Sequence, residues 1–200
     1  MRRTWLGFTV AALALSPAAG SAQFAWDSPW LLPPRAADGV GIFLVDVHGG
    51  ELGVLGMWRS PSYNFGIRLG LAEAPVDDIG VFGGLDFAGE LTRSTEEFPL
   101  DIDWLVGVGL GVRNGALISA PVGLTFGHEF QGDGVGFLPF IAPRVVLDAC
   151  LDCGRRNDDS DLDLEFAVDI GLDLRVTRAF IVRFGATLGD RDGVGIGLFF

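Results

Sequence analysis

The sequence contains no lysine, so arginine supplies all 14 of its basic side chains, against 26 acidic ones. The formal net charge of −12 argues against a nucleic-acid partner, because such proteins carry basic patches. Two cysteines leave a zinc site without a second pair of ligands. There is also no run of about 20 apolar residues, so a membrane-spanning helix is excluded, although 49% of the residues are apolar.

The first 22 residues have the pattern of a secretory signal peptide. Arg2 and Arg3 precede an apolar run over 6–15, and small residues over 18–22 suit cleavage before Gln23. The apolar run is too short for a helical anchor, and no cysteine follows as in a lipoprotein. We therefore predict a signal peptide over 1–22, a mature N-terminal segment over 23–38 and a barrel domain over 39–200.

Polar and apolar side chains alternate over long stretches of the chain. The run "DLDLEFAVDIGLDLRV" (161–176) carries only apolar side chains at even positions and all six of its charges at odd ones. A period of two is typical of an extended strand with two different faces. We read ten such strands, at 39–47, 51–59, 63–73, 78–90, 101–113, 116–127, 137–148, 161–176, 179–188 and 193–200.

These strands have the length that a bilayer requires. Most exceed the ~5–6 residues of an ordinary strand and suit the ~9–11 needed to cross a membrane at a tilt. Asn114-Gly115, between two of them, predicts a tight hairpin. Aromatic residues concentrate near the turns on the side of the C-terminus, which predicts an interfacial girdle there: Trp58, Tyr63, Phe65, Phe87, Trp104, Phe126, Phe130, Phe137 and Phe180.

Energetics assign the two faces of the strands. An arginine that faces lipid costs about 2–4 kcal/mol, against a total stability of about 5–15 kcal/mol. The charged face must therefore point inward, and glycines on it leave room for long side chains. We predict a charge network in the lumen made of Asp86, Glu90, Asp101, Asp103, Asp163, Glu165, Asp169, Asp173, Arg59, Arg68, Arg113, Arg144, Arg175 and Arg183.

The stretch "GVGIGLFF" at 193–200 resembles the C-terminal β-signal of the small outer-membrane β-barrel family (OmpA/OmpX-like proteins), with Gly195, Leu198 and Phe200 as its assembly signal. The resemblance implies an all-β fold, an antiparallel up-and-down transmembrane β-barrel, for which we read ten strands and leave eight open. It also implies a bacterial outer-membrane location. The partners would be outer-membrane lipid, lipopolysaccharide and the barrel-assembly machinery, and the protein would be a monomer.

The mature N-terminal segment "FAWDSPWLLPPRAADG" contains two tryptophans and three prolines. Its apolar content predicts a plug or lid packed at the periplasmic mouth, with a disordered leader as the alternative. The interior of a ten-strand barrel is narrow, and paired arginine and carboxylate side chains would largely fill it. We therefore expect no open wide pore.

The connection after the seventh predicted strand holds two further candidate sites. Cys150 and Cys153 predict a small disulfide in an oxidising compartment, with a redox pair as the alternative. Asp158, Asp159 and Asp161 are weak candidates for binding Ca²⁺, because they gather oxygen ligands without EF-hand spacing. A solvated acidic loop is the other reading of these three residues.

Catalytic motifs are sparse. His48 and His128 fall at opposite ends of the predicted barrel, so they cannot serve one site. His48 with Asp46 and Glu51 is the one cluster that a barrel enzyme acting on lipid or peptide at the rim would use. No G-x-G-x-x-G motif opens a helix. We predict no enzymatic activity and no cofactor, but a structural or surface-binding role, with a narrow diffusion channel for small solutes as the alternative.

Overall fold

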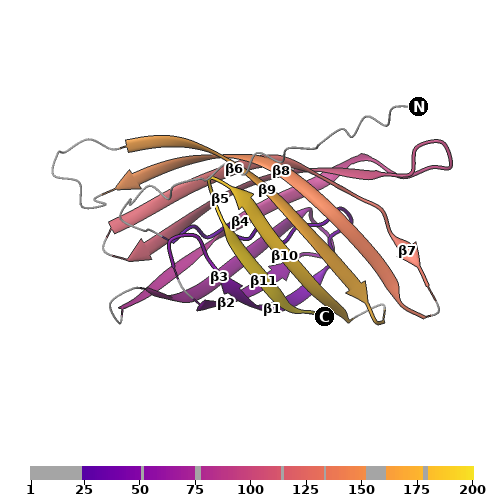
Figure 1. The fold of residues 1–200 in the computed structure, drawn as a ribbon, viewed down its shortest axis with the longest axis horizontal. Coiled ribbons are helices and arrows are strands. Elements are labelled where there is room, and N and C mark those ends of the chain that lie inside the picture. The colour runs from indigo at the N-terminus through magenta and orange to yellow at the C-terminus, as the bar shows by residue number, and fades with distance from the viewer. Residues whose placement is uncertain are drawn as a thin grey trace, which may run out of the picture.

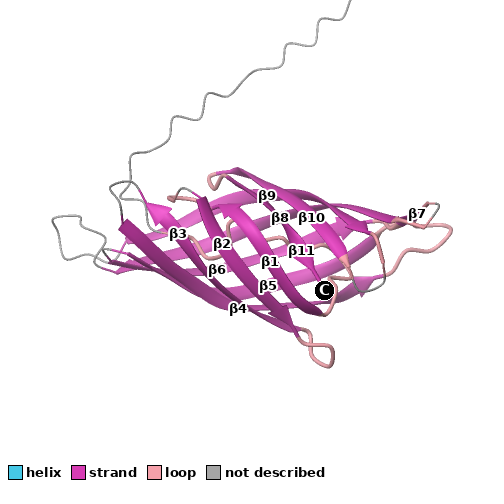
Figure 2. Ribbon diagram, turned by 90° about the horizontal axis from the view of Figure 1, so that it is seen from below, coloured by secondary structure: helices cyan, strands magenta, loops and turns pink. Residues whose placement is uncertain are grey.

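The computed structural model describes residues 24–50, 52–74, 78–113, 115–132, 134–151, 161–177 and 180–200. Within these ranges the chain forms strands and loops and no helix, so it contains no helix long and apolar enough to cross a membrane. The strands form one closed antiparallel β-barrel, in which they are strongly tilted (Figures 1 and 2).

The elements are β1 (Gly39–Asp46), β2 (Leu52–Arg59), β3 (Phe65–Ala74), β4 (Asp78–Thr92), β5 (Asp101–Arg113), β6 (Gly115–Gly127), β7 (Phe130–Gln131), β8 (Gly136–Leu151), β9 (Asp161–Arg175), β10 (Ile181–Gly189) and β11 (Gly193–Phe199). Ten of them form the wall, in which each strand pairs with the next along the chain. Pairing of β1 with β11, and of β6 with β8, closes the barrel. The two-residue strand β7 pairs only with the start of β8 and extends that hairpin.

The predicted fold class is confirmed, and the eight-strand alternative is excluded. The largest difference in a strand boundary is three residues, at the end of β8, which reaches Leu151 instead of the predicted 148. β5 and β6 are joined by a tight connection, in which Arg113 pairs with Gly115 and Val112 with Ala116; Asn114 of the predicted Asn114-Gly115 turn lies outside the described residues. The alternating pattern located the strands well because each strand has one face toward the lumen and one away from it.

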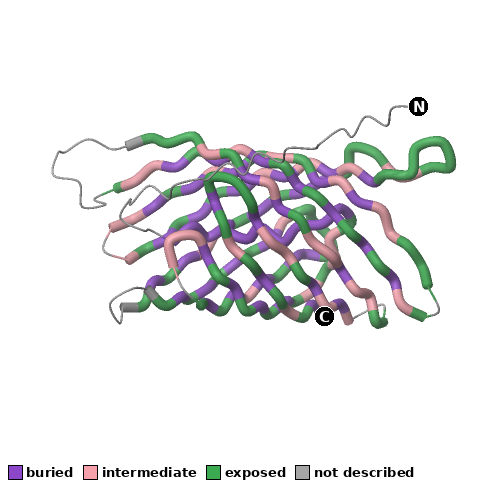
Figure 3. Tube along the Cα trace, viewed as in Figure 1, coloured by how far each residue is buried: buried purple, intermediate pink, exposed green. Residues whose placement is uncertain are grey.

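Buried and more exposed residues alternate along the strands of the wall (Figure 3). In β9 the odd-numbered Asp169 and Asp173 are buried inside, whereas the even-numbered Leu164, Phe166 and Ile170 are exposed outside. The outward face is apolar on all ten wall strands, as the exposure of valine, leucine, isoleucine and phenylalanine side chains on them shows. The barrel therefore has a charged interior and an apolar exterior.

The barrel has two distinct ends. The C-terminal end carries Phe200 and the connections β2–β3, β4–β5, β6–β8 and β9–β10; the opposite end carries the remaining connections. Aromatic rings gather at the C-terminal end, where the ring centroids of Trp58 and Phe65 lie 5.5 Å apart and those of Phe65 and Phe87 lie 6.2 Å apart. These rings lie where the predicted girdle places them.

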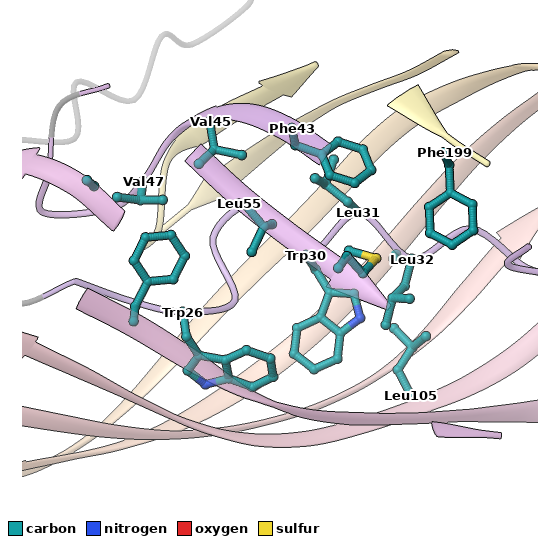
Figure 4. Packing of buried hydrophobic residues seen from close by; sticks show 14 of the residues in the cluster. Trp26, Trp30, Leu31, Leu32, Phe43, Val45, Val47, Leu55, Leu105 and Phe199 are labelled. Carbon is teal, nitrogen blue, oxygen red and sulfur yellow. The ribbon is translucent and has the colours of Figure 1, made fainter. Parts of the chain in front are cut away.

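The apolar core of the molecule lies inside the barrel. Residues 24–32 contribute Phe24, Trp26, Trp30, Leu31 and Leu32 to it, and all five side chains are buried. Figure 4 shows Trp26, Trp30, Leu31 and Leu32 packed among side chains of the wall, including Phe43, Leu55, Leu105 and Phe199. We call residues 24–38 the lumen segment.

Candidate functional site

The lumen segment passes through the barrel from one end to the other. Phe24 lies beside Gly50 and Gly80 at the opposite end. Arg35 binds Asp101 at the C-terminal end, and the chain then enters β1. We predicted that this segment packs at the mouth on the side of the C-terminus; it instead occupies the lumen and reaches that mouth only at its last residues.

Glycines on the inner face of β4 and β5 form a trough for the aromatic rings of the lumen segment. A Cβ atom on Gly109 would lie 2.2 Å from the Trp26 ring, and one on Gly107 would lie 2.8 Å from both indoles. At Gly111 it would lie 1.7 Å from the carbonyl oxygen of Phe24. The glycines therefore make room for the lumen segment, whereas the sequence had led us to expect that they make room for the charged side chains of the wall.

Asp27 is the one carboxylate of the lumen segment that lies deep in the barrel, and two arginines of the wall bind it. Arg191 donates from Nη1 to Asp27 Oδ1 at 2.7 Å, and Arg144 Nη1 donates to Oδ2. The side chains of all three residues are fully buried. Opposite charges this close favour the ionised carboxylate, and each of its oxygens has its own guanidinium partner.

The same two arginines are also bound by carboxylates of the wall. Arg144 donates to Asp169 from Nε at 2.8 Å and from Nη2 at 3.3 Å. Arg191 donates to Asp148, and its Nε lies 2.7 Å from Glu165 Oε2. The wall therefore fixes both guanidinium groups independently of Asp27.

Arg68 forms the centre of a second cluster, on β3. Its Nε donates to Asp86 at 2.9 Å, and Asp86 also accepts from Arg59. The guanidinium carbon of Arg68 lies 5.7 Å from the ring centroid of Trp26 and 5.1 Å from that of Trp30. Cation–π attraction of this kind contributes about 2 kcal/mol or more where water is excluded.

Trp30 lies between charged groups from two sides of the barrel. Arg144, on β8, has its guanidinium carbon 5.6 Å from the Trp30 ring centroid, on which Arg68 also packs. The two indoles themselves lie 5.3 Å apart, and Trp26 Nε1 donates to the carbonyl oxygen of Ser119 at 3.4 Å. The aromatic pair thus connects strands of the wall that do not pair with each other.

Hydrogen bonds fix the backbone of the lumen segment at Leu31. This residue has a φ of 58°, which is uncommon for a side chain other than glycine. Its carbonyl oxygen accepts from Arg183 Nη1 at 2.9 Å, and Arg183 also donates to both oxygens of Asp173, at 2.6 and 2.8 Å. Strained residues persist where the surroundings determine their conformation, and Arg183 provides such a constraint here.

Arg35 anchors the lumen segment at the C-terminal end. Its side chain donates to Asp101 at 2.9 Å and its backbone N–H donates to Asp103 at 3.0 Å. Its carbonyl oxygen accepts from Arg175 at 3.2 Å. Arg35 also has a positive φ, of 53°, so contacts with the wall again accompany an uncommon backbone conformation.

The predicted charge network is found in the lumen for most of its members. Nine of them are buried inside the wall: Arg59, Arg68, Asp86, Asp101, Asp103, Arg144, Asp169, Asp173 and Arg183. Glu165, Arg113 and Arg175 are partly exposed, whereas Glu90 and Asp163 are exposed. Arg113 has its guanidinium carbon 6.0 Å from the Phe24 ring, and Glu90 pairs with Arg93 at 3.0 Å.

Charged pairs line the lumen and do not fill it, which differs from our expectation. The wall pairs Arg183–Asp173 and Arg144–Asp169 each join neighbouring strands. Side chains of the lumen segment occupy the space between them. Interior volume is therefore filled by apolar packing, which requires no compensation of buried charge.

Sequence reasoning missed Asp27, Asp148 and Arg191, which complete the network. Asp27 and Arg191 lie outside strands, in the lumen segment and in the β10–β11 connection, where alternation gives no information. One signal was available, because "GIFLVDV" at 41–47 is apolar on both faces except at Asp46. Its inward residues Phe43, Val45 and Val47 pack on the lumen segment, so a strand with two apolar faces indicated an apolar partner inside the barrel.

The remaining predicted residues lie elsewhere. Cys150 is disulfide-bonded, but Cys153 lies outside the described residues, as do Asp158 and Asp159 and the side chain of Asp161. Gly195 faces the lumen, while Leu198 and Phe200 face outward on the strand that closes the barrel. Phe200 exchanges two backbone hydrogen bonds with Val40, of 2.7 and 2.8 Å.

The two histidines lie at opposite ends of the barrel, as predicted. His48 Nδ1 lies 3.4 Å from Asp192 Oδ1 at an exposed position, and Glu51 lies outside the described residues. The His128 ring packs on Phe130, with centroids 4.8 Å apart. Among the described residues, no three His, Cys, Asp or Glu side chains are placed to hold a metal ion.

Cavities also lie outside the packed lumen. A recess of about 670 Å³ lies over β1 and β9–β11 and is lined largely by apolar side chains that point outward, such as Leu44, Phe184 and Ile196. A polar cavity of about 220 Å³ lies at the C-terminal end, between Arg35, Arg59, Arg93 and Asp103. The arginines of this cavity are already paired with carboxylates.

Comparisons with models of protein families, with curated proteins and with solved structures found no significant match to this chain. The resemblance to small outer-membrane barrels therefore stays a prediction. Within the described residues, two arginines, two indoles and a row of glycines adapt the lumen to one internal segment.

Proposed function

We propose that the protein is an integral outer-membrane β-barrel with a structural or surface-binding role and no open wide pore. The observation that carries this proposal is the inverted distribution of polarity. Charged side chains such as Arg68, Asp86 and Arg183 are buried inside, while leucine, isoleucine and valine side chains are exposed all around the wall. A continuous apolar exterior suits lipid, and exposed apolar patches of such extent are rare on soluble monomers.

The signal-peptide pattern at the N-terminus supports export. The outward aromatic rings at the C-terminal end support a membrane interface, because tryptophan and phenylalanine girdles mark that depth in membrane barrels. The "GVGIGLFF" strand supports recognition by the barrel-assembly machinery, and its outward residues Leu198 and Phe200 would present the signal to it. Lipid and lipopolysaccharide are the expected surroundings of the folded barrel.

The occupied lumen supports a closed barrel over the alternative of a narrow diffusion channel. Trp26 and Trp30 are 1% and 0% exposed, so solvent does not reach the middle of the lumen segment. A function at the surface or in envelope integrity follows more directly from a filled barrel than solute transport does.

Fractionation tests the location. In a double-membraned bacterium, the full-length protein should enter the outer-membrane fraction and resist extraction by high salt and by alkali. A periplasmic protein that stays soluble after complete processing would contradict the proposal.

Reconstitution into planar lipid bilayers tests the closed lumen. The purified full-length protein should give no sustained conductance steps, although its insertion is verified by recovery of folded protein from the bilayer lipid. Reproducible steps from folded protein would favour the diffusion channel.

A further inference from the structure

The Asp27 carboxylate is bound in the way that a protein binds a free carboxylate ligand. Arg144 and Arg191 approach it from different elements, and each takes one oxygen. Neither guanidinium nor carboxylate is exposed. Charge-assisted hydrogen bonds of this kind are about twice as strong as neutral ones, so the arrangement is selective for an anion.

Carboxylates outside the lumen segment hold both arginines of this site. Asp169 positions Arg144 through two hydrogen bonds, and Asp148 and Glu165 position Arg191. Removal of Asp27 would therefore leave both guanidinium groups in place, with an N–H of each directed at an empty position. A preorganised site of this kind loses little conformational entropy when it binds a ligand.

Arg68 supplies a further donor beside the site. Its side chain is fully buried, and its Nη1 and Nη2 atoms have no hydrogen-bond acceptor among the described residues. The Arg68 guanidinium lies over Trp26 and Trp30, and the Trp30 ring also packs on Arg144 of the site. Buried donors without acceptors cost free energy, and a ligand that brings another acceptor would satisfy them.

We propose that Arg144 and Arg191, with Arg68 beside them, form a carboxylate-binding site in the lumen, and that Asp27 is its internal ligand. The Trp30 ring, on which both Arg144 and Arg68 pack, defines the ligand class: a small carboxylate carried on an aromatic or apolar body. The lumen segment occupies the site as a competitor in the same chain. The inference concerns the lumen alone, so it holds in detergent and does not depend on cellular location.

The test is rescue of the full-length Asp27→Ala variant by formate. Alanine removes the carboxylate and leaves space in which formate fits. The variant, folded in detergent, should lose its fast migration on unheated SDS gels at a lower temperature than the wild type. Formate should raise that temperature, and the shift should grow with the logarithm of its concentration once the site begins to fill. Sodium chloride at equal ionic strength corrects for salt.

Three controls make the result specific. The wild type should show no formate shift beyond that of chloride, because Asp27 fills the site. Asp27→Asn should show none either, because the amide occupies the same volume. Asp38→Ala changes an exposed aspartate of the same segment that lines the polar cavity at the C-terminal end, and it should behave as the wild type.

The proposal is overturned if formate raises the transition temperature of folded Asp27→Ala no more than chloride does. It is also overturned if formate raises the transition temperature of Asp27→Asn as much as that of Asp27→Ala. Where Asp27→Ala does not fold in buffer, folding yield replaces the transition temperature. Recovery of yield by formate and not by chloride supports the site, and no recovery overturns it. Conductance of the wild-type protein would contradict the proposed closed barrel without affecting this result.

Discussion

Asp27 and Arg191 lie 164 positions apart in the sequence, yet Oδ1 of one and Nη1 of the other are 2.7 Å apart inside the barrel. Asp27 belongs to the lumen segment, and Arg191 belongs to the connection before the last strand. The pair thus ties the first described part of the chain to its last hairpin. Both side chains are fully buried, so their charges require compensation from buried partners, which this pair shares with Arg144, Asp148 and Glu165.

Replacement of Arg191 by Leu should lower the free energy of unfolding by about 3–5 kcal/mol, because Asp27, Asp148 and Glu165 lose their shared cation. Urea unfolding in detergent, followed by tryptophan fluorescence, measures this change. Asp192→Asn is the control, since it removes an exposed pair with His48 and should cost less than about 1 kcal/mol. If both variants lost the same free energy of unfolding, the buried cluster would not be important for stability.

Replacement of Gly111 by Ala should destabilise the barrel by about 1–3 kcal/mol, because the new methyl group overlaps the backbone of Phe24. Gly56→Ala is a matched control. A Cβ there meets only the carbonyl oxygen of Leu69, at 3.6 Å, and the change should stay within about 0.5 kcal/mol. Should both variants unfold at the same urea concentration as the wild type, the lumen segment does not occupy the trough.

Replacement of Leu164 by Arg should reduce refolding into lipid vesicles, because a lipid-facing arginine costs about 2–4 kcal/mol at mid-bilayer depth. Its neighbour Asp163 lies on the other face and is exposed, so Asp163→Arg should refold as well as the wild type. The folded fraction on unheated SDS gels measures the refolding yield of both variants. Similar yields for the two variants would argue against the outward face as the lipid-facing one.

Cys150 and Cys153 should form a disulfide with each other in the exported protein. Thiol-specific labelling of intact cells without reductant is then expected to modify neither residue, and labelling after reduction should modify both. Prior replacement of either residue by Ser frees the other for labelling. Labelling of both cysteines before reduction would revive the reading as a redox pair.

The alternating pattern predicted the wall of the barrel because it reports a local property, the two faces of a strand. In β9 and β5, alternation alone separated inward Asp169 and Asp103 from outward Ile170 and Trp104. The composition of the lumen segment, with its two tryptophans and three prolines, likewise distinguished it from the strands. Both inferences required only side-chain polarity and its period along the chain.

The position of the lumen segment could not be derived in the same way. Its contacts join residues far apart in sequence, such as Trp26 with Ser119 and Leu31 with Arg183, and no periodic signal encodes them. The glycines at 107, 109 and 111 allowed two interpretations: they could make room for side chains of the wall or for another segment of the chain. Only the path of the backbone decides between them.

The most direct test of a lipid-facing wall around an internal segment is fluorescence quenching in vesicles of brominated lipid. Two variants of the full chain retain a single tryptophan, either Trp104 on the outward face or Trp30 in the lumen, with phenylalanine at the others. Bromine quenches at short range, so Trp104 should be strongly quenched and Trp30 weakly, with Trp30 also protected from aqueous iodide. Quenching of Trp30 by lipid as strong as that of Trp104, or no quenching of Trp104, would contradict the account.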